Sequence, residues 1–209
     1  MAALAHLNTT EQQAVAQGLA AYARALAARH PGASETAPAP IEIVAGYRPG
    51  WIGRVAEMHA AHYSRHWGFG QFFESTVASG AAEFTGRLDH PRNQAWAAIH
   101  DGRIVGSIAI DGEDLGDNQA HLRWFIMDPA LRGRGLGRRW LDEAIAQARR
   151  IGAPQRQLWA RAGLGAAAHL CGAAGFVLTE EVVADQWGRS VAERRLALPL
   201  RPNGRHERR

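Results

Sequence analysis

A segment rich in glycine and arginine, Leu131-Arg132-Gly133-Arg134-Gly135-Leu136-Gly137, constrains the fold more than any other part of the chain. It lies between a hydrophobic stretch typical of a strand, 119–127, and a stretch with helical periodicity, 137–150. Three glycines let the backbone approach a ligand closely, and a helix start presents unpaired N–H groups with a partial positive charge. Arginine side chains add charge-assisted hydrogen bonds to phosphate oxygens. We therefore expect a strand–loop–helix unit that binds a diphosphate.

Two common phosphate-binding motifs do not fit this segment. A dinucleotide-binding fingerprint needs G-x-G-x-x-G and an acidic residue about twenty positions later, whereas the segment reads G-R-G-L-G and is followed by two arginines. A P-loop needs a lysine, and all 24 basic residues of the chain are arginine. In a third interpretation, Gly133, Gly135 and Gly137 only form a turn, and both arginines are solvated.

The composition limits the remaining possibilities. With 209 residues the chain has room for one domain with a core of roughly 160 residues. Its single cysteine, Cys171, excludes an intramolecular disulfide and fits a reducing cytoplasm. No run of about 18 apolar residues occurs, and the first residues lack the features of a signal peptide. We therefore expect a soluble, cytoplasmic protein with no membrane partner.

The formal net charge of +4 favours a polyanionic ligand such as a nucleotide cofactor. This excess is too small to indicate nucleic acid by itself. The tail 199–209 is basic and is expected to be disordered, with contact to nucleic acid as a minor alternative. Nothing in residues 1–40 could form a helix-turn-helix, so we expect no nucleic-acid partner.

An N-terminal part, 1–40, is expected to be an appendage of the main domain. Residues 8–29 favour a helix, because Asn8 and Glu11 can form a capping box and apolar residues recur on one face. The stretch 31–40 is rich in proline and alanine and is predicted to be a linker. We expect this helix to need a partner for its apolar face, which holds Val15, Leu19, Tyr22 and Leu26.

Residues 41–198 are expected to form one α+β domain around a mixed sheet. The dipeptide Asp101-Gly102 supplies the positive φ angles of a tight turn, so strands at 94–100 and 103–111 should be antiparallel neighbours. The other predicted strands are 41–45, 119–127, 157–161, 176–183 and 191–198. The predicted helices are 49–66, with Pro49 at its first position, 71–88, 137–150 and 165–173.

Two motifs of this domain resemble those of the GNAT superfamily of N-acetyltransferases. Arg132-x-x-Gly135-x-Gly137 is similar to the signature R/Q-x-x-G-x-G/A, and residues 168–176, A-H-L-C-G-A-A-G-F, are similar to the second cofactor motif. The resemblance covers residues 41–198. It implies a GNAT-like mixed, mostly antiparallel twisted sheet flanked by helices, with an extra N-terminal helix. It also implies direct, acetyl-CoA-dependent transfer of an acetyl group to a primary amine. We expect a small-molecule amine or an amino acid as the acceptor, with a protein amine as the alternative.

The resemblance assigns acetyl-CoA to one strand and the loop that follows it. The strand would carry a bulge, and its backbone would pair with the pantetheine arm and orient the acetyl carbonyl. The amides of residues 133–138 would bind the pyrophosphate. Arg161 stands where an asparagine often holds the pantetheine arm, and it could instead reach a phosphate. The predicted cofactor-binding residues are Phe125, Ile126, Met127, Arg132, Gly133, Arg134, Gly135, Leu136, Gly137, Arg138 and Arg161.

His121 and Cys171 are the predicted catalytic residues. An amine with a pKa near 10.4 is only about one part in a few thousand neutral at pH 7, so a base is needed. His121 lies where histone-type members carry a glutamate base, but it could also be a structural histidine bonded to a backbone carbonyl. Cys171 stands where a tyrosine commonly protonates the leaving thiolate. It could be a weaker donor or an inert core residue.

The acceptor is expected to bind to the first two helices of the domain. Segments around Trp67-Gly68-Phe69 resemble, more loosely, the acceptor-side helices of GNAT domains fused to MarR-type regulators. Helix 8–29 resembles the dimer-forming helix of such a regulator, which implies a homodimer. Arg123 could attract an acceptor carboxylate or pair structurally with an acidic residue. The predicted acceptor-binding residues are His59, Tyr63, Trp67, Phe73 and Arg123.

Strand periodicity predicts two distinct faces for residues 119–127. One face, which could line a cleft, would hold Gln119, His121, Arg123 and Phe125, and the other, expected in the core, would hold Leu122, Trp124 and Ile126.

Two alternatives concern the chemistry of the site. The spacing of His59, His62 and His66 could suit a metal ion, but histidines on a surface or in an acceptor cleft are far commoner, and we expect no metal. A second class of function is a non-catalytic acetyl-CoA sensor, in which the loop binds the cofactor but the loss of the tyrosine prevents turnover. Amine-dependent release of the thiol would distinguish an enzyme from a sensor.

Overall fold

The computed structural model describes residues 6–29, 40–116, 119–131, 133, 135–151, 157–162, 166–184 and 190–200. The chain divides into two compact units, Met1–Pro40 and Ile41–Arg209. The predicted linker and the predicted basic tail lie almost entirely outside the described residues. Within the described ranges, no helix is long and apolar enough to cross a membrane.

The first unit contains one helix, α1 (Thr9–Arg29), in its described part. Asn8 Oδ1 accepts a hydrogen bond from the Glu11 N–H at 3.0 Å, and Glu11 Oε2 accepts one from the Asn8 N–H at 2.8 Å. The capping box predicted from these two residues is therefore confirmed. The large apolar side chains Val15, Leu19, Tyr22 and Leu26 are exposed within this unit.

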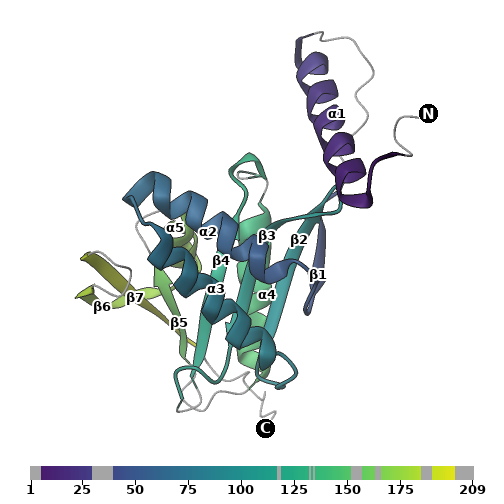
Figure 1. The fold of residues 1–209 in the computed structure, drawn as a ribbon. Helices are drawn as coiled ribbons and strands as arrows, with labels where there is room; N and C mark the ends of the chain where they lie inside the picture. The colour runs from purple at the N-terminus through teal and green to yellow at the C-terminus, as the bar shows by residue number, and fades with distance from the viewer. Residues whose placement is uncertain are drawn as a thin grey trace. The chain divides into compact units, whose positions relative to one another are not determined.

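A seven-stranded sheet with the order β1-β2-β3-β4-β5-β7-β6 forms the centre of the second unit (Figure 1). Neighbouring strands are antiparallel except β4 and β5, which are parallel. The predicted mixed, mostly antiparallel sheet is thus confirmed. The strands are β1 (Glu42–Ala45), β2 (Gln94–His100), β3 (Arg103–Asp111), β4 (Ala120–Met127), β5 (Gln157–Ala162), β6 (Val177–Ala184) and β7 (Val191–Pro199).

The hairpin between β2 and β3 turns at the predicted dipeptide. Asp101 and Gly102 have φ angles of 49° and 71°, and His100 pairs directly with Arg103. Two consecutive positive φ angles match the twist of the flanking strands, which is why Asp-Gly favours this turn. The antiparallel pairing predicted from the dipeptide is confirmed.

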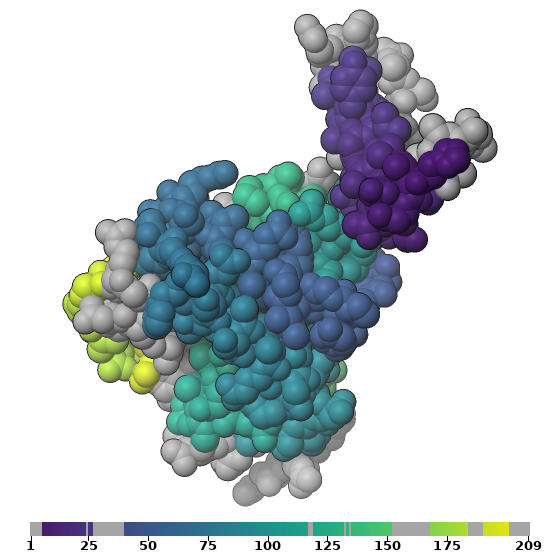
Figure 2. All heavy atoms as spheres, viewed as in Figure 1, coloured from purple at the N-terminus to yellow at the C-terminus, as the bar shows by residue number. Residues whose placement is uncertain are grey.

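Helices cover both faces of the sheet. The helices α2 (Trp51–Trp67) and α3 (Gln71–Gly86) lie on one face, where their side chains cover much of the sheet, and α4 (Leu136–Arg150) lies on the other (Figures 1 and 2). The short helix α5 (Ala166–Ala173) packs beside α4. A short 3-10 helix, η2 (Pro129–Leu131), precedes α4 in the chain. Gly50 has a φ of 86° and caps α2, so this helix begins two residues after Pro49 rather than at it.

Each face of the sheet has its own hydrophobic core. The core under α2 and α3 includes Trp51, Val55, Phe73, Phe84, Trp124 and Ile126, and the core under α4 includes Ile108, Leu122, Trp140, Leu141 and Ile145. The predicted grouping of Leu122 with Trp124 and Ile126 on one face is therefore wrong.

A bulge in β4 is the reason. Ala109 pairs with Arg123 and Ser107 with Ile126, so two residues of β4, Trp124 and Phe125, oppose a single residue of β3. Trp124 has a φ of 48°, and its carbonyl accepts a hydrogen bond of 2.7 Å from the buried Ser107 hydroxyl. The extra residue reverses the alternation of the strand, and Trp124 therefore lies on the same face as Arg123.

Candidate functional site

The strands β4 and β5 pair along only part of their length. Their register covers Ala120–Leu122 of β4 and Leu158–Ala160 of β5, whereas β4 continues to Met127. Within the described residues, the backbone of β4 from Trp124 to Met127 therefore has no ladder partner on the β5 side. An unpaired strand edge offers N–H and C=O groups to an extended, amide-containing ligand. The bulge lies at the start of this unpaired segment.

The predicted cofactor strand coincides with this unpaired edge. Phe125 and Met127 are partly buried and pack against the core under α4, and Ile126 is buried in the core under α2 and α3. Their side chains are thus anchored in the two cores, so it is their backbone that lies at the edge.

The start of α4 follows this edge and is capped by glycine. Gly133 and Gly135 have φ angles of 78° and 74°, and Gly135 is the N-cap residue with no side-chain cap bond. The Arg139 N–H bonds to the Gly135 carbonyl at 3.2 Å, so the amides of residues 136–138 precede the first helical hydrogen bond. A Cβ at Gly137 would lie 3.0 Å from Leu170 of α5, which explains why a small residue is needed there.

The structure describes only some of the arginines that were predicted to bind the cofactor. Arg132 and Arg134 lie outside the described residues. Arg138 donates to Asp142 at 3.2 Å and to the Ala173 carbonyl at 3.3 Å, and so links α4 to the end of α5. Arg161 pairs with Arg195 of β7 through its backbone, and its side chain lies outside the described residues.

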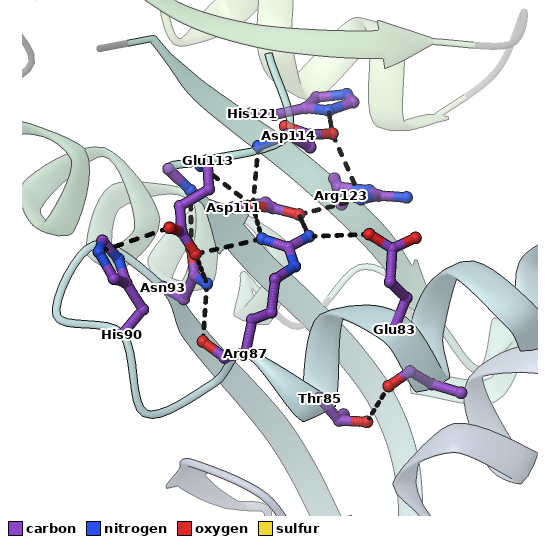
Figure 3. Close-up of polar contacts among 12 residues, drawn as sticks. Glu83, Thr85, Arg87, His90, Asn93, Asp111, Glu113, Asp114, His121 and Arg123 are labelled. Atoms are coloured by element: carbon purple, nitrogen blue, oxygen red, sulfur yellow. Dashed lines mark hydrogen bonds and ion pairs between the residues drawn. The ribbon is translucent and has the colours of Figure 1, made fainter. Parts of the chain in front are cut away.

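His121 is on β4 at the point where β4 and β5 are still paired, and it is buried. Its Nδ1 lies 2.6 Å from Asp114 Oδ2, in the loop after β3 (Figure 3). Its pairing partner across the ladder is Asp111 of β3, so both side chains lie on the face covered by α2 and α3. Asp114 was not predicted; its proximity depends on the strand register, and the seven-residue separation carries no signal of its own.

Asp111 is the centre of the polar network beside this histidine. Its fully buried carboxylate accepts hydrogen bonds from Arg87 at 3.0 and 3.1 Å, from Arg123 at 3.0 Å, and from the N–H groups of Glu113 and Asp114 (Figure 3). Burial alone would raise the pKa of Asp111, but the hydrogen bonds from Arg87 and the Glu113 N–H, with Arg123, outweigh it and hold the pKa below its usual value. The carboxylate therefore stays ionised at neutral pH.

Arg123 pairs within the protein. Its Nη1 lies 3.0 Å from Asp111 Oδ2 and 3.3 Å from Asp114 Oδ2, and its guanidinium lies 4.0 Å from the centre of the Trp124 ring. Of the two interpretations of Arg123, the geometry favours structural pairing over attraction of an acceptor carboxylate.

Three of the predicted acceptor residues belong to an aromatic cluster between α2 and α3. The Tyr63 ring lies 5.0 Å from Trp67, 5.7 Å from Phe69 and 4.9 Å from Phe73, centre to centre. Burial, with the charge of Glu193 on β7, raises the pKa of Tyr63. Glu193 was not predicted, and it places the start of β7 near this cluster.

His59 stacks on Tyr63 but is a buried, neutral residue. Burial lowers its pKa to about 4, although its Nδ1–H donates to the Val55 carbonyl at 2.8 Å. The rings of His62 and His66 lie 4.7 Å apart. Among the residues that the structure describes, no group of three His, Cys, Asp or Glu side chains could hold a metal ion.

Cys171 lies in the core under α4 and is 2% exposed. Burial raises the pKa of its thiol to about 11. A thiol in this position stays protonated and is shielded from solvent. Of the two interpretations of Cys171, these observations favour the inert core residue over the proton donor.

The sequence profile of the Acetyltransferase (GNAT) family matches residues 54–176. No curated protein sequence matches the chain. Among solved structures, yncA of Salmonella typhimurium, determined with its cofactor acetyl-CoA, is similar at a TM-score of 0.60 and 19% identity, over 79% of this chain and 97% of its own.

Two further structures share the fold. An acetyltransferase from Streptococcus agalactiae is similar at a TM-score of 0.60 and 17% identity, over 77% of this chain and 98% of its own. The spermidine N-acetyltransferase SpeG of Vibrio cholerae is similar at a TM-score of 0.53 and 14% identity, over 76% of this chain and 92% of its own.

Proposed function

The chain belongs to the GNAT family of acetyltransferases, and we therefore propose that it transfers the acetyl group of acetyl-CoA directly to a primary amine of a small molecule. One observation carries this proposal. The unpaired, bulged edge of β4 leads directly into a glycine-capped helix start, so backbone donors for an extended arm and for a diphosphate lie in one continuous path. The acetyl-CoA bound to the similar yncA structure supports the same ligand for this chain.

The residues at this path fit acetyl-CoA. The backbone from Phe125 to Met127 would pair with the pantetheine arm, and the amides of residues 133–138 would bind the pyrophosphate. A Cβ at Gly135 would meet no protein atom within 4 Å and would project into open space, so a glycine at this position leaves that space free for a ligand. Arg132 and Arg134 would add charge-assisted hydrogen bonds. Acetyl-CoA itself supplies an activated acetyl thioester.

The base proposed for the reaction is His121. The amine nitrogen attacks the thioester carbonyl carbon, the bond from carbon to sulfur breaks, and the amine proton passes to His121 Nε2. The leaving thiolate takes a proton from solvent. An acid adds at most roughly 2 kcal/mol here, since a thiol with a pKa near 8.5 lies only about 1.5 units above pH 7. Cys171 is not needed for this step.

The proposed acceptor site is the aromatic cluster of Tyr63, Trp67, Phe69 and Phe73. Such rings bind apolar carbon chains and attract cations over their faces. The carboxylate of Glu193, which acts on Tyr63, would favour a positively charged amine. The similar SpeG protein is named for spermidine, an amine of this kind, which supports a small-molecule amine for this chain.

Isothermal titration with acetyl-CoA tests the proposal. The double variant Arg132→Ala, Gly135→Asp should lose micromolar binding, because it removes one guanidinium and adds a side chain and a negative charge at the helix start. Arg48→Ala, Gly46→Asp is a matched control, since Gly46 also has a positive φ of 87° and an open Cβ site. No binding by the parent protein would contradict both the enzyme and the sensor.

A second assay separates these two functions. Release of the free thiol from acetyl-CoA that depends on an added amine, over a panel of polyamines, arylalkylamines and amino acids, supports the transferase. Binding with no release over the whole panel supports the alternative, a non-catalytic acetyl-CoA sensor.

The N-terminal helix is proposed to form a dimer contact. The apolar side chains on α1 are between 37% and 64% exposed within its unit. This arrangement agrees with the looser resemblance to domains fused with MarR-type regulators, which stays a prediction, as does a cytoplasmic location. Removal of residues 1–40 should convert a dimer to a monomer in sedimentation velocity. The same oligomeric state in both chains would contradict the proposed dimer contact.

A further inference from the structure

The loop after β3 carries an acidic side chain that contacts the proposed base. We propose that Asp114 is a positioning residue, which holds the neutral His121 ring with its proton on Nδ1 so that Nε2 accepts the proton of the substrate amine, and that Asp111 holds Asp114 in place. This inference rests on the proposed function. It assigns a role to Asp111 and Asp114, two residues that lie outside the family motifs at 132–137 and 168–176.

The contact between the two side chains selects one tautomer of the histidine. The distance from Asp114 Oδ2 to His121 Nδ1 is 2.6 Å, and His121 is only 7% exposed. An ionised carboxylate only accepts hydrogen bonds, so Nδ1 must carry the hydrogen. In a neutral ring the lone pair is then on Nε2, the nitrogen that can take up a proton.

The position of Asp114 is fixed by Asp111. Asp111 Oδ1 accepts hydrogen bonds from the N–H groups of Glu113 and Asp114, at 3.2 and 3.3 Å, which closes a tight turn at the end of β3. Arg87, at the end of α3, binds both oxygens of Asp111. The turn is therefore attached to a helix on the acceptor side of the sheet, and its backbone is held from two directions.

Charged side chains from several elements surround this contact. Among the described residues, these are Asp111 on β3, Asp114 in the loop, Arg123 on β4 and Arg87 at the end of α3, with Glu83 and Glu113 beside Arg87 (Figure 3). Arg123 Nη1 shares the same Asp114 oxygen that bonds to His121. Asp114 therefore contacts a guanidinium group as well as the imidazole, and these two contacts hold its carboxylate beside β4.

The same contact stabilises the product of proton transfer. When the amine proton passes to Nε2, the imidazole becomes an imidazolium ion. Its Nδ1–H bond to Asp114 is then charge-assisted on both sides and roughly twice as strong as a neutral one. Removal of the carboxylate charge therefore affects both the orientation of the ring and the acceptance of the proton.

Nitrogen NMR of the imidazole rings tests the contact without an activity assay. His121 is assigned by the loss of its signals in His121→Gln. In the full-length parent protein, above the titration of the ring, we expect its hydrogen on Nδ1; in Asp114→Asn the Nε2–H form should appear. Hydrogen on Nε2 in the parent protein, or an unchanged tautomer in Asp114→Asn, would overturn the proposal.

Kinetics with acetyl-CoA and the best amine of the panel test the consequence. Asp114→Asn should lower kcat between about 10-fold and 10⁴-fold with little change in KM, and move the acidic limb of the pH profile to lower pH. Asp114→Glu should restore part of the loss. Glu113→Gln is the matched control in the same loop, since Glu113 contacts Arg87, His90 and Asn93, and should keep parental kcat and tautomer.

The two levels of failure are distinguishable. If no amine releases the thiol but the tautomer changes as expected, the proposed function fails and the contact stands. If turnover is found and Asp114→Asn keeps parental kcat and pH profile while remaining folded by thermal denaturation, the positioning role is wrong and the transferase stands.

Discussion

Replacement of Asp111 by asparagine tests the polar network that supports the candidate site. Asp111 Oδ2 accepts hydrogen bonds from Arg87 Nη2 and Arg123 Nη1, both at 3.0 Å, and its side chain is fully buried. In Asp111→Asn, an NH₂ group at the position of Oδ2 would face the guanidinium donors of Arg87 and Arg123, and both arginines would lose their shared counter-charge. With the amide in the opposite orientation, the NH₂ group would stand at the position of Oδ1 and face the backbone N–H groups of the turn.

The size of the effect follows from these contacts. Hydrogen bonds to charged groups contribute about 1.5–3 kcal/mol each, so the loss of two would cost about 3–6 kcal/mol. The side chains of Arg87 and Arg123 are 29% and 23% exposed and keep Glu113 and Asp114 as partners, so water and these carboxylates recover part of the loss. We therefore expect the free energy of unfolding to fall by about 3 kcal/mol at pH 7.

The difference between parent and variant should depend on pH in a defined direction. The pKa of Asp111 is lower in the folded state than its unfolded value near 3.9. Its contribution to stability is then fully present above about pH 4 to 5 and is lost as the pH falls through the folded-state pKa. The difference should be constant from pH 7 to about pH 5 and shrink below about pH 4.

Urea denaturation followed by tryptophan fluorescence measures these differences. Asp142→Asn is the control, because Asp142 is 57% exposed and forms a surface pair with Arg138; it should change stability by less than about 0.5 kcal/mol. A loss below about 1 kcal/mol in Asp111→Asn, or a difference that grows at low pH, would refute the reasoning.

Three further predictions concern other parts of the domain. Gly106→Val should lower the free energy of unfolding by about 1–3 kcal/mol, because even a Cβ at Gly106 would lie 2.8 Å from two atoms of the Trp140 ring. Ser107→Ala should cost about 1–3 kcal/mol and weaken acetyl-CoA binding in calorimetry, because it leaves the buried Trp124 carbonyl without its 2.7 Å hydrogen bond and loosens the bulge. Cys171→Ala should keep parental kcat, and Cys171 should react with a thiol reagent only after unfolding, because the thiol is 2% exposed and its pKa is about 11.

Each of these has a contrary outcome. Gly53→Ala is the control for Gly106, since a Cβ at Gly53 would meet no atom within 4 Å; an equal loss in both variants would contradict the steric reasoning. Unchanged stability and an unchanged Kd for acetyl-CoA in Ser107→Ala would show that the Ser107 hydroxyl does not stabilise the bulge. A loss of kcat above about tenfold in a folded Cys171→Ala would favour Cys171 as the proton donor.

Local sequence signals accounted for much of the fold. Asn8 and Glu11 predicted the cap of α1, and Asp101-Gly102 predicted the turn between β2 and β3, because both depend on atoms within four residues of one another. The element order was predictable because helical and strand periodicities are properties of short windows. The start of α2 was misplaced by two residues, because Gly50, in a left-handed conformation, took the cap position after Pro49.

The candidate site was predictable only in part. The glycine pattern that ends in Gly137 identified the loop at the start of α4, since close approach and positive φ require glycine itself. His121 was predicted from its position, but its partner Asp114 was not. Their contact depends on the register of β3 and β4 and on a turn held by Asp111 and Arg87, which come from different elements.

The sequence by itself determined the strand–loop–helix unit, the order of the elements and the family, because each depends on patterns among residues that are close together in the chain. Only the tertiary structure decided which face each residue of β4 occupies, because the bulge at Trp124 adds one residue and reverses the alternation, and tryptophan at a positive φ has no sequence signature. It also decided the surroundings of Arg123 and Cys171. Pairing and burial depend on side chains that reach a residue from other elements, and no local pattern records them.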